Sequence, residues 1–124
     1  MLRLIATFAA AASFATPALS GNHTDQAPSA KELMQTCVAA DNDARDGILF
    51  EIECEQFVSG FVQALQVTGM AGEGTAICPP AVNMADEVRW AFTRWVHGSF
   101  TERTQMSAAD ALLSALKDEF PCGG

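Results

Sequence analysis

Four cysteines are the residues of this 124-residue sequence whose type and spacing bear most directly on chemistry. They form no close Cys-x-x-Cys pair and have no neighbouring histidine, so their spacing is unlike that of a zinc site. In a small exported chain, four cysteines are typical of two disulfide bonds. Oxidised cysteines also leave no thiolate for nucleophilic catalysis. We therefore expect no metal site and two disulfides among Cys37, Cys54, Cys78 and Cys122.

The two histidines are the other candidates for catalysis. His23 lies in a polar N-terminal segment, and His97 lies near the end of a predicted helix with no partner at a recognisable spacing. The sequence also lacks the G-x-S-x-G and H-E-x-x-H motifs and a glycine-rich phosphate loop. We expect no catalytic residue, no cofactor and no enzymatic activity.

An acidic stretch, Asp41–Gly47, resembles a calcium-binding loop only superficially. Such a loop needs glycine at its sixth position and glutamate at its twelfth. Counted from Asp41, those positions hold Asp46 and Ile52. The stretch is better interpreted as a solvated turn between two helices.

The charge of the chain restricts its partners. Seven basic residues stand against 15 acidic residues, which gives a formal net charge of -8. Nucleic acids and anionic lipids both attract basic surfaces, so neither is an expected partner. The negative field instead favours a basic partner. The alternative is that the charge serves only to keep a small protein soluble.

The N-terminus carries the pattern of a secretory signal. Residues 1–20 combine Arg3, an apolar run and small residues before a cleavage point after Ser20. The run is too short to span a bilayer, so we expect no membrane insertion after cleavage. We expect export of the chain, a flexible arm over 21–28 and a helical domain over 29–124.

Capping and periodicity predict the first two helices. Ser29 and Glu32 form a capping-box pattern at the start of a helix that should end near Ala39. A central helix is predicted from Ile48 to about Gly69, and its core-facing residues are Phe57, Val58, Phe61, Val62 and Leu65. Because glycine destabilises a helix interior, Gly60 indicates a point where another helix packs closely.

Two further helices follow, separated by loops over 69–80 and 98–105. The third should begin after Asn83 and end near Val96, with an inward stripe of Val88, Ala91, Phe92 and Trp95. The fourth should begin after Ser107 and end before Pro121, with an inner face of Ala109, Leu112, Leu113, Leu116 and Phe120. The predicted fold is an all-α four-helix domain.

Helix order favours one of the three possible disulfide pairings. Cys37 lies late in the first helix and Cys54 early in the second, and a short connector makes these helices antiparallel neighbours. Cys78 precedes the third helix and Cys122 follows the fourth. We therefore predict the bonds Cys37–Cys54 and Cys78–Cys122.

Trp90 does not belong to the inward stripe of the third helix. It falls on the opposite side with Arg94, and tryptophan and arginine are enriched at binding hot spots. The alternative is that Trp90 packs beneath a loop or the N-terminal arm. Together with the following loop, this surface gives the candidate partner-binding residues Trp90, Arg94, Phe100, Glu102 and Arg103.

The cysteines and their contexts resemble the Rap/Tai family of type VI secretion immunity proteins. The resemblance covers Glu32 to Cys122 and rests on Cys37, on Cys54-x-x-Phe-x-x-Gly60-Phe61, on Cys78-Pro79-Pro80 and on Phe120-Pro121-Cys122. The family often has His-Pro after its third helix, where this chain has His97-Gly98.

The resemblance implies a compact, all-helical periplasmic protein, often a homodimer. Such proteins bind a peptidoglycan amidase effector and block its active-site cleft. We therefore expect a periplasmic immunity protein with a cell-wall amidase as its partner. The alternatives are a small disulfide-bonded acid-stress chaperone of the periplasm and a helical binding protein for another envelope partner.

Overall fold

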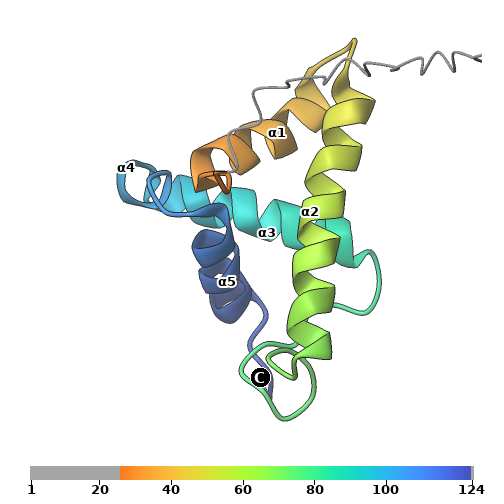
Figure 1. The fold of residues 1–124 in the computed structure, drawn as a ribbon, viewed down its shortest axis with the longest axis vertical. Helices are drawn as coiled ribbons and strands as arrows, with labels where there is room; N and C mark the ends of the chain where they lie inside the picture. The colour runs from red at the N-terminus through yellow and green to blue at the C-terminus, as the bar shows by residue number, and fades with distance from the viewer. Residues whose placement is uncertain (1–25, 124) are drawn as a thin grey trace, which may run out of the picture.

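The computed structural model describes residues 26–123, and over this range the chain is helical with no strand (Figure 1). The expected signal peptide, and residues 21–25 of the expected arm, lie outside the described residues. The predicted all-α class is confirmed. A one-turn helix occupies part of the stretch that was expected to be a loop, so five helices form rather than four: α1 (Ala30–Asn42), α2 (Gly47–Val67), α3 (Met84–Gly98), α4 (Phe100–Arg103) and α5 (Ala108–Glu119).

Helices α1 and α5 begin with the serine caps that the sequence predicts. The Ser29 hydroxyl accepts a hydrogen bond from the Glu32 backbone N–H at 3.3 Å, and the Glu32 carboxylate accepts one from the Ser29 N–H at 2.8 Å. The hydrogen bonds that the Ser29 N–H and the Ser29 hydroxyl donate to the Glu32 carboxylate hold the pKa of Glu32 below its usual range. The Ser107 hydroxyl accepts from the Asp110 N–H at 3.1 Å. Each cap satisfies a backbone donor that the helix itself leaves free.

The starts of α1 and α5 are joined to each other. The Ala30 N–H donates to the Met106 carbonyl at 2.9 Å, and the Ala108 N–H donates to the Pro28 carbonyl at 2.9 Å. Pro28, the last residue of the expected flexible arm, is therefore held against the start of α5.

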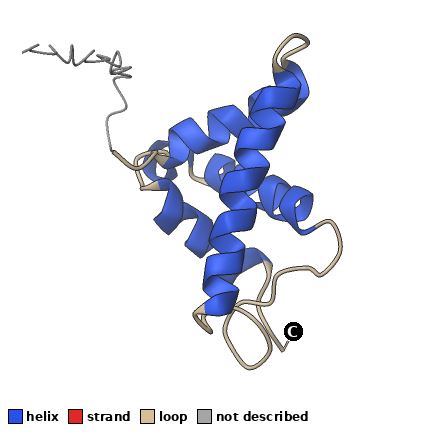
Figure 2. Ribbon diagram, turned by 45° about the vertical axis from the view of Figure 1, so that its right-hand side comes forward, coloured by secondary structure: helices blue, strands red, loops and turns tan. Residues whose placement is uncertain are grey.

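Helix α3 is in contact with each of the other helices. Helix α2 is the longest and runs along the long axis of the molecule, α1 packs most extensively against it, and α3 crosses behind α2 (Figure 1). Helix α5 packs on α3, and the long connection from α2 to α3 lies beside the C-terminus at the lower end of α2 (Figure 2). None of the helices in residues 26–123 has the length and apolar character needed to cross a bilayer.

The core lies where these helices meet. The predicted inward stripe of α3 is confirmed, since Val88, Ala91, Phe92 and Trp95 are all buried. On α2 the predicted face is also correct, although Phe57 and Phe61 are only partly buried. On α5 the prediction for Ala109 was wrong, because the buried side of that helix begins one residue earlier and leaves Ala109 exposed. The α5 side chains in the core are Ala108, Ala111, Leu112, Ala115 and Leu116.

Both predicted disulfides are present. Cys37–Cys54 joins α1 to α2 inside the core, with 5.1 Å between the two Cα atoms. Cys78–Cys122 joins the α2–α3 connection to the segment after α5, with 4.9 Å between its Cα atoms. Next to it, the buried Ile77 anchors the connection in the core. Each end of the fold is thus cross-linked.

The prediction that another helix packs closely at Gly60 was wrong. Gly60 lies on the exposed side of α2, and a Cβ built there would have no neighbour within 4 Å. The glycine that permits a close approach is Gly47, the first residue of α2. A Cβ there would lie 2.8 Å from the backbone oxygen of Ala40. The tight turn between α1 and α2, rather than a helix crossing, is what requires glycine.

These two glycines should therefore respond oppositely to alanine. Gly47→Ala should lower the free energy of unfolding by about 1–3 kcal/mol, because backbone atoms must move to admit the methyl group. Gly60→Ala should raise it by up to about 1 kcal/mol, because alanine is the better helix former and the site is open. Urea unfolding of the two oxidised variants gives both values. Equal destabilisation by the two changes would contradict this account.

Candidate functional site

Trp90 and Arg94 lie on the outer face of α3, as the sequence predicts. Trp90 is 49% exposed, and the Arg94 side chain is 66% exposed. The spacing of Trp90, Arg94 and His97 places them on one side of the helix, opposite the buried stripe. We call this outer row of α3 the α3 ridge. Its exposure shows that Trp90 is not covered by any segment within residues 26–123.

A small hollow lies beside the Trp90 ring. Its volume is about 170 Å³, and its lining comes from α1 and α3: Cys37, Val38, Asp41, Asn42, Arg89, Trp90 and Thr93. The Arg89 guanidinium carbon lies 5.4 Å from the centroid of the Trp90 ring. The hollow therefore combines an aromatic ring, a buried cation and an acidic rim.

Arg89 is the residue of this region that sequence reasoning missed. It is only 5% exposed, and its Nη2 lies 3.0 Å from an Asp86 carboxylate oxygen and 3.7 Å from one of Asp41. Its Nε and Nη1 have no hydrogen-bond partner among residues 26–123. A buried charge is tolerated when it is paired. Two features of the sequence could have indicated that Arg89 is buried and paired. Asp86 lies three residues before it, and the inward-facing Val88 directly precedes it.

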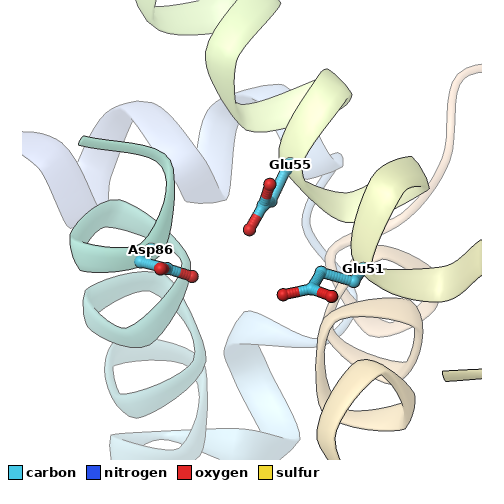
Figure 3. A group of neighbouring side chains, drawn as sticks. All are labelled: Glu51, Glu55 and Asp86. Atoms are coloured by element: carbon cyan, nitrogen blue, oxygen red, sulfur yellow. The ribbon is translucent and has the colours of Figure 1, made fainter. Parts of the chain in front are cut away.

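A cluster of carboxylates lies next to Arg89. Glu51 and Glu55 of α2 and Asp86 of α3 point toward one another, and one carboxylate oxygen from each lies within 4.8 Å of the others (Figure 3). Burial is the main cause that raises the pKa of Glu55, with further contributions from the charges of Asp86 and Glu51, while Arg89 opposes the shift. Oxygen ligands of this kind suit hard cations. Here the guanidinium bonded to Asp86 already supplies positive charge.

The segment after α3 gives the remaining predicted residues different roles. Phe100 is 45% exposed, and its ring stacks on His97 with centroids 5.9 Å apart, so it extends the α3 ridge. Glu102 is exposed. Arg103 turns inward: its guanidinium lies 3.7 Å from the Trp95 ring centroid and donates a hydrogen bond to the Trp95 carbonyl. Arg103 thus holds α4 against α3.

The other edge of the α3 ridge is bonded to α5. Arg94 Nη2 lies 3.4 Å from a Glu119 oxygen, and Trp95 Nε1 donates to Asp118 at 2.7 Å. An exposed pair such as Arg94 and Glu119 contributes little to stability. The Arg94 guanidinium is therefore free to exchange Glu119 for a partner's carboxylate.

The carboxylate cluster predicts how stability changes with pH. The pKa of Glu55 is higher in the folded chain than in the unfolded chain, so the folded chain binds this proton more tightly. Glu55 therefore lowers stability above its folded pKa, and this effect disappears as the pH falls below the unfolded value. Glu55→Gln should raise the free energy of unfolding by about 0.5 kcal/mol near neutral pH, because it removes a partly buried charge that also repels Glu51 one helical turn away.

The gain from Glu55→Gln should vanish near pH 4, which urea unfolding over a pH series would measure. The matched control is Glu53→Gln, which removes a charge from the same helix but outside the cluster. A gain that stays constant with pH, or an equal gain from Glu53→Gln, would contradict a role for the cluster.

Comparison with known proteins identifies the family. The family model described as Rap1a immunity proteins matches residues 29–122, which include all five helices and both disulfides. No curated protein and no solved structure matches the chain. Immunity proteins act by binding a toxic effector, in agreement with the function expected from the sequence. The chain belongs to the family of Rap1a immunity proteins.

Proposed function

We propose that this protein acts in the periplasm, where it binds a peptidoglycan amidase delivered by type VI secretion and occludes its active-site cleft. Family membership supports the immunity role, and the resemblance of the cysteine contexts supports the amidase as target. The two disulfides suit an oxidising compartment outside the cytosol. The protein would act by occupying the cleft and would catalyse nothing itself.

The half-exposed Trp90 is the observation that carries the proposed contact surface. A tryptophan on a surface next to an exposed arginine is a typical binding hot spot. Trp90 projects from α3, the helix that contacts all the others, so the backbone beneath it is fixed before binding. A preorganised surface loses less conformational entropy on association. We propose that Trp90, Arg94, Phe100 and Glu102 contact the effector and that Arg103 positions α4.

A capture experiment tests the proposed partner. The oxidised protein is immobilised and exposed to type VI secretion supernatants of the producing strain and related strains. One amidase retained in stoichiometric amount, and inhibited when bound, is the expected result. Retention of a broad mixture at acidic pH alone would instead indicate a chaperone. Retention of a single non-amidase protein would keep the immunity role and overturn the amidase.

Substitution of Trp90 tests the contact surface. Trp90→Ala should weaken binding to the captured amidase by about 2 kcal/mol, or roughly 30-fold in Kd, because the large ring would lose its burial at the interface. Val67→Ala, which truncates a side chain that is 88% exposed on α2, is the matched control and should leave Kd unchanged. Titration calorimetry measures both.

If folded Trp90→Ala binds the amidase with unchanged affinity, the α3 ridge is not part of the interface. The immunity role would still stand. Light scattering of the same samples reports the homodimer that the family resemblance implies.

A further inference from the structure

The first turns of α2 leave three large apolar side chains in solvent. Ile48 is 68% exposed, Leu49 is 62% exposed and Ile52 is 47% exposed. At about 100° per residue, these side chains fall within an arc of about 100° on the side of α2 away from its buried face. We call Ile48, Leu49 and Ile52 the apolar patch. Isolated exposed apolar residues are ordinary, but a contiguous group on one helix face is typical of a binding surface.

The same part of the chain concentrates the negative charge. Residues 41–55, which we call the acidic tip, hold six acidic residues against Arg45 alone, a net charge of -5 out of -8 for the whole chain. The turn between α1 and α2 forms one end of the molecule, at the top of Figure 1 and far from the C-terminus. The acidic residues of the tip are Asp41, Asp43, Asp46, Glu51, Glu53 and Glu55.

These charges lie on both sides of the apolar patch. By helical spacing Glu53 flanks the patch next to Leu49, and Glu51 and Glu55 flank it next to Ile48. Glu51 and Glu55 also point toward Asp86 of α3, whose own charge is paired with Arg89 (Figure 3). At the start of the tip, the Asp43 carboxylate accepts hydrogen bonds from the Arg45 and Asp46 N–H groups, which fixes the turn.

From this arrangement we infer that the acidic tip is a docking surface for a protein whose own surface offers an apolar hollow bordered by lysine and arginine. Burial of the apolar patch supplies the affinity, because large aliphatic side chains are stabilised when they leave water. The surrounding carboxylates attract and orient the basic partner. The inference rests on the exposure and charge of residues 41–55 and not on the identity of the effector.

Charge disfavours two other occupants of such a patch, a second copy of the chain and an anionic membrane. A second copy of the chain would bring one acidic tip, with a net charge of -5, against another. Like charges brought together across an interface oppose association. An anionic membrane surface is repelled for the same reason. With a basic protein, burial of the apolar patch and attraction by the surrounding carboxylates both favour binding.

A defined probe tests this inference without the natural partner. The probe is a short helical peptide of leucine and lysine, added to the isotope-labelled, oxidised full-length protein and followed by NMR. Amide shifts should centre on residues 46–56, and affinity should fall as salt rises from about 0.05 to about 0.5 M. The combined variant Ile48→Gln, Leu49→Gln and Ile52→Gln should weaken binding at least about tenfold.

Matched variants distinguish binding of the peptide at the apolar patch from its nonspecific attraction to an acidic protein. Val67→Gln changes another exposed side chain of α2 and should alter affinity by less than about twofold. Asp46→Asn with Glu53→Gln should weaken binding more than Glu73→Gln with Glu87→Gln, which removes the same number of exposed charges elsewhere.

Equal effects from these pairs, or shifts centred outside the tip, would overturn the inference. So would a dimer of the unmodified protein that the triple variant abolishes, or binding to phosphatidylcholine vesicles that the triple variant loses.

Discussion

Burial of the apolar stripe on α3 is the constraint on which the rest of this small domain depends. Val88, Phe92 and Val96 are almost completely inaccessible, and helices α1, α2 and α5 all pack against the helix that carries them. With one side of α3 committed to the core, its opposite side must face solvent or another molecule. The outward position of Trp90 and Arg94 follows from this periodicity. Burial of one side of α3 therefore determines both the core and the outward surface that we propose contacts the effector.

Charge is distributed unevenly over this framework, and Arg89 is the one buried cation in the part of the chain that the structure describes. Arg89 lies at the junction of α1, α2 and α3, bonded to Asp86 and close to Asp41. It balances part of the negative charge that Glu51 and Glu55 bring to the same place. Replacing Arg89 alone would leave several carboxylates facing one another, so the junction depends on a guanidinium that can reach two helices at once.

Sequence patterns predicted the parts of this fold that depend on local or periodic signals. The caps at Ser29 and Ser107, the α3 stripe and the pairing of all four cysteines followed from spacing and helix order. Features set by three-dimensional contacts were missed: Gly47 adjoins the Ala40 carbonyl, and Arg103 turns back onto Trp95. Gly60 shows the converse error, because a glycine in a helix indicates a close approach only if a neighbouring element lies there. The α3 ridge was predictable as an outward face, whereas the buried Arg89 beneath it was not.

The two disulfides differ greatly in the length of chain that each encloses, and this difference sets an order for oxidative folding. Cys37 and Cys54 are 17 residues apart in one helical hairpin, so under oxidising conditions they can meet as soon as that hairpin forms. Cys78 and Cys122 are 44 residues apart and meet only after α3 and α5 have been completed and have packed together. Early oxidation of Cys37 with Cys54 leaves Cys78 without a wrong partner inside the chain. The pairing of neighbours along the sequence thus protects this protein from disulfide scrambling as it folds.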